Sequence, residues 1–250
     1  MSHVHVTTTQ GIAEVRLERG KVNALNEEVV DELAERFRRL AADPAVRSVV
    51  LTGTGKFFSF GFDIPGFLGH SKEAFLGYLR KFAALYRDLF AHPGPVVAAL
   101  NGHAVAGGCM LALACDARLM AAGKGKIALN EISFGSSLFA GSVEMLRYTV
   151  GGRNAQQIAC SGAMLAPEEA LALGLVDRVV PEAELLATAR ELAGVHGAKD
   201  PAAFRSVKAL LRGPVLEEMA RREEASLREF VDIWYSERTR ENLKKIEIRA

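Results

Sequence analysis

Hydrophobic and polar residues alternate in two short runs near the start of the chain, at 4–9 and 12–17. A period of two is typical of half-buried strands, so these runs predict a β-hairpin. Leu33, Phe37 and Leu40 instead recur every three or four residues, which predicts a helix whose buried face they form. The chain therefore begins with strands and then changes to helix.

This alternation of strands and helices continues to about residue 140. Further strands are expected at 47–52, 96–100, 117–121 and 126–129, and helices at 26–42, 72–91 and 107–115. The rest of the chain is expected to be helical at 142–150, 154–161, 167–173, 182–194, 202–211 and 215–237, with one strand at 176–180. This order predicts an α/β core at 1–190 and a helical C-terminal region at 191–250.

Composition narrows the class of protein. The chain has 250 residues, and its net charge of +1 provides no basic excess for binding nucleic acid. No apolar stretch is long enough to span a membrane, and the N-terminus lacks a signal or transit pattern. Cys109, Cys115 and Cys160 lack metal-ligand spacing. We therefore expect a cytoplasmic protein with reduced thiols and without a metal, nucleic-acid or membrane partner.

Two glycine-containing segments, 59–63 and 106–110, carry the candidate chemistry. Gly61 permits a backbone conformation that is closed to other residues, and the following N–H, of Phe62, can face a ligand. Gly107 follows a predicted strand and begins a predicted helix, whose first N–H groups are unpaired and suit a developing negative charge. Taken alone, either segment is better explained as a tight turn in a packed core.

In this order the two segments resemble the signature of the crotonase (enoyl-CoA hydratase/isomerase) superfamily. The likeness covers nearly the whole chain, including 21–26, 167–170 and 174–177. It implies the crotonase (ClpP-like) fold, a repeated ββα superhelix with a helical C-terminal region that serves trimerisation. It also implies an acyl-CoA substrate, no cofactor other than the coenzyme A of that substrate, and a homotrimer or a dimer of trimers.

The resemblance also assigns roles to residues of both segments. The backbone N–H groups of Phe62 and Gly107 correspond to the oxyanion hole that holds the thioester oxygen, with Ala106 in place of the first glycine of the family's run. Candidate contacts to substrate or coenzyme A are Lys21, Ala24, Phe60, Asp63, Ile64 and Gly108. Lys21 is equally well explained as a solvated lysine, and Asp63 as a residue that orders its loop.

Glu131 is the candidate catalytic acid/base. It matches the later glutamate of the family and lies in an otherwise apolar run, 127–134, where desolvation is expected to raise its pKa. Hydratases of the family have another glutamate where this chain has Met110, and methionine holds no proton. One carboxylate with an oxyanion hole is enough to move a proton from C2 to C4 of a 3-enoyl-CoA, so the favoured reaction is its isomerisation to 2-enoyl-CoA.

Several alternatives stay open. The function could instead be an enoyl-CoA hydratase or another crotonase-type reaction, an RNA-binding protein, or an acyl-CoA binder without turnover. Glu144 is the reserve candidate for the acid. His103 is better explained by packing or exposure, and Cys109 by burial than by nucleophilic chemistry. Lys244 and Lys245 are candidates for contacts to the phosphates of coenzyme A, although the residues after them depart from the family's usual ending.

Overall fold

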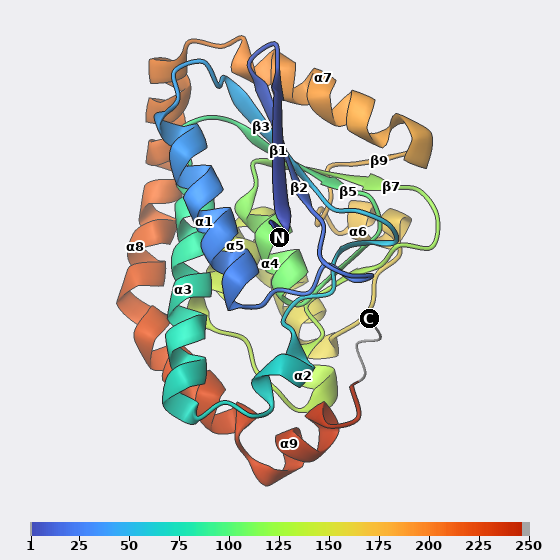
Figure 1. The fold of residues 1–250 in the computed structure, drawn as a ribbon, viewed down its shortest axis with the longest axis vertical. Coiled ribbons are helices and arrows are strands. Elements are labelled where there is room, and N and C mark those ends of the chain that lie inside the picture. The colour runs from blue at the N-terminus through green and yellow to red at the C-terminus, as the bar shows by residue number, and fades with distance from the viewer. Residues whose placement is uncertain (1, 247–250) are drawn as a thin grey trace.

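A six-stranded sheet forms the centre of the α/β core in the computed structural model, which describes residues 2–246 (Figure 1). The order of its strands is β1 (Val4–Thr9), β2 (Ile12–Leu17), β3 (Ser48–Thr52), β5 (Val96–Leu100), β7 (Ala117–Ala121) and β9 (Arg178–Val180). The predicted hairpin is present as the antiparallel pair β1–β2, and every later pair is parallel. β3 and β5 are buried on both faces, as parallel strands covered by helices are.

A second sheet of three short parallel strands lies next to the first. Its strands are β4 (Phe57–Ser59), β6 (His103–Val105) and β8 (Ile127–Ala128). Each follows a strand of the large sheet along the chain, and a helical segment follows each in turn. The structure therefore contains the repeated ββα unit of the predicted fold class.

Helices cover both faces of the large sheet (Figure 1). On one face lies α7 (Leu185–Gly197), which packs on a small apolar cluster that includes Val50, Val97 and Leu119. The larger core on the other side involves α1 (Glu27–Ala42), α3 (Lys72–Phe90), α4 (Gly107–Ala114) and α5 (Ala140–Ser161). The short helices are α2 (Ile64–Phe67), η1 (Glu131–Phe134), α6 (Pro167–Ala172) and η2 (Glu182–Glu184). The domain boundary expected at residue 190 falls inside α7.

The C-terminal helices differ from the prediction. The expected break between 211 and 215 is wrong, because α8 (Pro201–Trp234) is one helix with Pro214 inside it. Packing against α3 and α5 holds α8 together across the proline. The expected end at 237 is also wrong, since Ser236 caps a separate helix, α9 (Glu237–Leu243). The predicted division between helices at 142–150 and 154–161 is confirmed, because Gly151 is non-helical (φ +75°, ψ 163°) and separates two helical stretches within α5.

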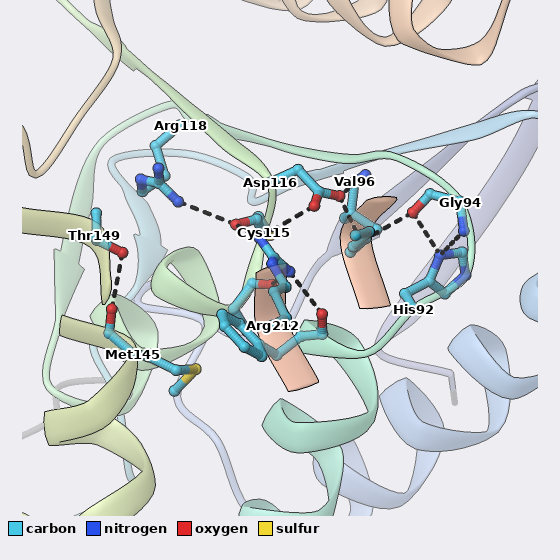
Figure 2. Close-up of polar contacts among 12 residues, drawn as sticks. His92, Gly94, Val96, Cys115, Asp116, Arg118, Met145, Thr149 and Arg212 are labelled. Carbon is cyan, nitrogen blue, oxygen red and sulfur yellow. Dashed lines mark hydrogen bonds and ion pairs between the residues drawn. The ribbon is translucent and has the colours of Figure 1, made fainter. Parts of the chain in front are cut away.

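Buried charges fasten α8 to the core (Figure 2). The ammonium group of Lys208 lies 2.7 Å from the carboxylate of Asp116, and the guanidinium of Arg212 lies 3.1 Å from the same carboxylate. Arg212 also donates hydrogen bonds to the carbonyls of Phe90 and Cys115, where α3 and α4 end. A cation at the carbonyl end of a helix is stabilising, so Arg212 stabilises the ends of both α3 and α4.

Among residues 2–246, no helix is both long and apolar enough to cross a membrane.

Candidate active site

A cavity of about 270 Å³ lies where the small sheet, η1 and α8 meet. We call it the acyl cavity, after the substrate that the sequence resemblance implies. Its walls are mostly apolar. It is lined by Phe60, Phe62, Ile64, Val105, Ala106, Asn130, Glu131, Ser133, Phe134, Phe230, Trp234 and Ile246. A concave apolar cavity with a few polar groups is the usual form of a small-molecule site.

The two glycine segments of the sequence meet at this cavity. Gly61 has a φ of +94°, a backbone conformation that residues other than glycine rarely adopt. A Cβ atom placed on Gly61 would lie 2.8 Å from the carbonyl oxygen of Val105 and 3.0 Å from the nitrogen of Gly107. Gly61 is therefore required both by its conformation and by the close approach of the second segment.

The backbone amides of Phe62 and Gly107 have the properties expected of oxyanion donors. Within residues 2–246, neither amide donates a hydrogen bond to a loop or side-chain acceptor. Gly107 is the first residue of α4, where a helix leaves its N–H groups unpaired. The Phe62 ring packs directly on Gly107, since a Cβ atom there would lie 3.1 Å from Phe62 Cε1. The predicted donor residues are thus neighbours: Phe62 lines the cavity, and Gly107 lies directly behind the Phe62 ring and next to Ala106 of the lining.

Ala106, just before Gly107, has an unusual backbone conformation. Its φ of +50° and ψ of −118° fall in a region that favours glycine. An alanine held there costs about 1–3 kcal/mol, and such strain is concentrated at functional sites. The crotonase signature has a glycine at this position. Ala106 therefore adopts a conformation that suits glycine, although it carries a Cβ atom.

Glu131 begins η1 and is the one titratable side chain among the described residues that line the acyl cavity. It is 4% exposed, and its Oε2 atom has no hydrogen-bond partner among residues 2–246. Burial in these apolar surroundings raises the pKa of Glu131 to about 8, against a smaller opposing effect of its own backbone N–H. A carboxyl group with a pKa near neutrality and a free oxygen is suited to taking up and returning a proton.

The other predicted contacts divide into two groups. Phe60 and Ile64 line the acyl cavity. Lys21, Ala24, Asp63 and Gly108 lie outside this lining, and their contacts to coenzyme A stay predictions. Asp63 pairs with Arg19 at 2.7 Å, a contact that orders the loop before α2. Gly108 packs so closely on β4 that a Cβ atom would overlap the Ser59 carbonyl.

The reserve residues also lie outside the lining of the acyl cavity. Glu144 pairs with Arg222 of α8 at 2.7 Å, so its carboxylate already has a structural partner. Met110 is buried in α4, and burial raises the pKa of the neighbouring Cys109 thiol well above its usual range. His103 packs its ring on Phe57, with ring centroids 4.9 Å apart.

The C-terminal end of the chain contributes a wall that the sequence did not reveal. Phe230 and Trp234 reach the acyl cavity from the last turns of α8, and Ile246 follows α9. The rings of Phe230 and Trp234 are both buried. Lys245 contacts Asn242 at 3.4 Å, and residues 247–250, part of the atypical ending, lie outside the described residues.

The repeated ββα units and the meeting of the two glycine segments define a protein with the crotonase fold. The sequence profile of the enoyl-CoA hydratase/isomerase family matches residues 7–249. The crystal structure of human mitochondrial delta3-delta2-enoyl-CoA isomerase is similar, with a TM-score of 0.93, 30% identity and coverage of 97% of this chain and 96% of that one. The chain belongs to the enoyl-CoA hydratase/isomerase family.

Curated relatives carry more than one activity in their names. Carnitinyl-CoA dehydratase of Escherichia coli K12 is 36% identical over 211 residues, which are 84% of this chain and 80% of the relative. Human mitochondrial enoyl-CoA delta isomerase 1 is 31% identical over 223 residues, or 88% of this chain and 74% of the relative. The family is therefore established, whereas the particular reaction has to be argued from the site.

Proposed function

We propose that this protein isomerises 3-enoyl-CoA to 2-enoyl-CoA by a proton shift that uses Glu131 alone. The observation that carries the proposal is that a single titratable side chain lines the acyl cavity in the described part of the chain. Its oxygen is unpartnered, and it shares the cavity with Phe62 of the candidate oxyanion hole.

The proposed mechanism has two proton transfers. The Glu131 carboxylate removes a proton from C2 of the substrate, and the electron pair moves into a dienolate whose charge rests on the thioester oxygen. The amides of Phe62 and Gly107 donate hydrogen bonds to that oxygen, a form of stabilisation typically worth 10²–10³-fold per donor. The Glu131 carboxylic acid then returns the same proton at C4, which leaves the double bond between C2 and C3.

Hydration or dehydration is the alternative within the family, supported by the name of the Escherichia coli relative. Adding water across a double bond requires one group to activate water and another to deliver a proton. The position at which family hydratases have a further glutamate is Met110 here, and Glu144 is committed to Arg222. These observations favour isomerisation over hydration.

We also propose which groups the enzyme needs and where in the cell it acts. Coenzyme A enters as part of the substrate, with no separate cofactor, and we propose cytoplasmic activity on acyl-CoA esters. Within residues 2–246, no group of three or more His, Cys, Asp or Glu side chains is arranged to hold a metal ion. Salt-dependent binding of RNA by this protein, or binding of acyl-CoA without turnover, would contradict the proposed activity.

A paired product assay tests the reaction. The purified protein is given a 3-enoyl-CoA and, separately, a 2-enoyl-CoA of the same chain length, and both products are separated by chromatography. We expect the double-bond shift to be much faster than the addition of water. Rapid formation of 3-hydroxyacyl-CoA would contradict the proposed function and would demand a second acid.

The variant Glu131→Gln tests the residue. It should retain acyl-CoA binding and lose about 10²–10⁴-fold in turnover, the range for general acid–base catalysis. Glu144→Gln is the matched control, because it neutralises a buried carboxylate outside the acyl cavity. If Glu131→Gln stayed within a few-fold of the parent while Glu144→Gln lost activity, the catalytic role would belong to Glu144.

A further inference from the structure

A second cavity, of about 320 Å³, lies at the end of the molecule where α7 gives way to α8, and we call it the distal cavity. It shares no lining residue with the acyl cavity. Its walls come from the end of α1 and the residues after it (40–48), from the loop 92–95 before β5, and from residues 196–205. The inference drawn from it does not depend on the proposed function.

Two buried polar side chains of this lining have unsatisfied atoms. Ser48 is 1% exposed and His92 is 4% exposed, and neither Ser48 Oγ nor His92 Nε2 has a hydrogen-bond partner within residues 2–246. Leaving such a group unpaired in a folded protein costs about 1–3 kcal/mol each, so paired groups are the rule. Two unsatisfied atoms in the lining of one cavity point to a ligand.

The protonation of His92 indicates what that ligand offers. Figure 2 shows its ring turned toward Gly94, whose N–H lies 3.2 Å from Nδ1. Nδ1 also lies 3.1 Å from the Gly94 carbonyl oxygen, but that oxygen accepts a hydrogen bond from the Lys208 ammonium, so we assign the Gly94 N–H as the donor to Nδ1. Burial lowers the pKa of His92 to about 4, so the ring is neutral and its proton lies on Nε2. With this assignment His92 Nε2 is a donor, and the Ser48 hydroxyl can donate as well as accept. An acceptor atom on the ligand can therefore satisfy both groups.

The exposed part of the lining is positively charged. Arg47, Lys199 and Arg205 line the cavity, and none of them is in an ion pair within the described residues. Arg47 is held in place, since its guanidinium donates to the carbonyls of Gly197 and Lys199 at 3.2 and 3.3 Å. Asp43 is the one acidic residue of the lining. Three cations against one carboxylate favour an anion that carries more than one charge.

Apolar groups complete the walls and set the size of the organic part. Leu40, Val46, Pro93 and Pro95 line the cavity, and the ring of Phe204 offers an aromatic face. The volume is at the lower end of the range for small-molecule pockets. A bare inorganic ion would leave these surfaces without a partner.

We propose that the distal cavity binds a phosphate monoester about the size of a nucleoside monophosphate. Its phosphate lies among Arg47, Lys199 and Arg205, and its organic part lies on Phe204 and the prolines. An oxygen of the organic part accepts hydrogen bonds from Ser48 and His92. A nucleotide and a sugar phosphate share this chemistry, and binding measurements separate them.

Isothermal titration calorimetry on the full chain uses four probes: adenosine 5′-monophosphate, ribose 5-phosphate, inorganic phosphate and adenosine. We expect one of the two esters to bind once per chain and at least about tenfold more tightly than inorganic phosphate, because the ester adds apolar contacts. Adenosine, which lacks the phosphate, should bind at least about tenfold more weakly than the ester. Equal affinity for both esters and inorganic phosphate, or binding by none of them, would overturn the proposal.

Variants place the bound ester. Lys199→Ala combined with Arg205→Ala should weaken ester binding by about tenfold or more, since two charge-assisted contacts are lost. The same variant should leave enoyl-CoA turnover unchanged, because both residues lie outside the acyl cavity. Arg153→Ala is the matched control and should bind normally, because it removes an exposed arginine of α5 that forms no ion pair within residues 2–246. Ester binding that survives the double variant would belong to the coenzyme A site, and the distal assignment would be wrong.

Ser48→Ala provides a test that changes no charge. The variant removes one buried donor and should weaken the ester several-fold while raising or preserving the thermal stability of the free protein, since an unsatisfied hydroxyl is removed. A loss of stability without any change in ester affinity would show that Ser48 has a structural role and that the ligand does not reach the buried end of the cavity.

Discussion

Glu131 connects the environment of a single residue to the pH dependence of the whole reaction. In the free protein its pKa is raised to about 8 by burial, so most molecules carry the protonated, inactive form of the base at neutral pH. We expect kcat/KM for a 3-enoyl-CoA to rise with pH and to level off above about 8, because this ratio reports the free enzyme. Steady-state rates between pH 5 and 9.5 measure this, and a flat profile below pH 8 would contradict the assignment.

The same proton equilibrium must appear in the free energy of unfolding. The folded pKa of about 8 exceeds the ordinary value of 4.5, so the folded state binds more protons than the unfolded state between these limits. The contribution of Glu131 to stability is therefore full below about pH 4.5 and is lost as pH rises through about 8. We therefore expect the free energy of unfolding of Glu131→Gln, relative to that of the parent, to be a few kcal/mol higher at pH 9 than at pH 5. Denaturant unfolding at the two pH values measures this difference.

Ala106 offers a second test at the scale of one residue. Its positive φ is easily adopted by glycine, so Ala106→Gly should raise the free energy of unfolding by about 1 kcal/mol, after the entropy cost of glycine is subtracted. Ala34→Gly, in the middle of α1, is the opposite control and should lower it by about 0.5–1 kcal/mol. Equal destabilisation by both substitutions would mean that position 106 is not strained.

At the scale of the elements, sequence patterns predicted the long segments better than the short ones. β1, β2 and α1 have enough residues to express a period, and their bounds agree closely with expectation. β4 and β6 have three residues each, too few for a period, and they form because neighbouring strands pair with them. The predicted helix break near Pro214 was wrong because local propensity favours ending a helix at a proline, whereas packing along α8 overrides this preference.

The site shows the same division between local and non-local information. Phe62, Gly107 and Glu131 could be named as candidates because their motifs are contiguous in the sequence. Phe230 and Trp234 were not assigned to the site, because a helical apolar stripe has the same appearance whether it covers a core or a cavity. Only the path of α8 across the molecule decides between them, and that path is a tertiary property.

The buried cluster that anchors α8 allows a test of this element. Arg212→Ala removes the hydrogen bonds to the carbonyls of Phe90 and Cys115 and leaves those carbonyls unsatisfied. We expect a loss of about 3–5 kcal/mol in the free energy of unfolding, the range for breaking a buried ionic contact. Arg221→Ala, which breaks an exposed pair with Glu218, should cost less than about 1 kcal/mol in the same denaturant titration. Similar losses would refute the anchoring role.

At the scale of the whole molecule, we propose a homotrimer or a dimer of trimers. Several large apolar side chains are exposed on the chain, among them Tyr148, Met164, Leu210 and Leu211. Exposed apolar groups of this size are often covered by a neighbouring subunit. Light scattering coupled to size-exclusion chromatography should give three or six times the 27.0 kDa mass of one chain. A mass of one chain at micromolar concentration would exclude this assembly.

One consequence follows from the path of α8, which runs along one side of the molecule (Figure 1). Its first turns line the distal cavity and its last turns line the acyl cavity, about 50 Å apart along a helix of 34 residues. If α8 moves as one body, a ligand bound at one end affects binding at the other. Thermodynamic linkage requires such an effect to be reciprocal. If a phosphate ester changes the affinity for acyl-CoA by some factor, acyl-CoA changes the affinity for the ester by the same factor. Because α8 lines both cavities, the protein could thereby respond to a phosphate ester that it does not convert.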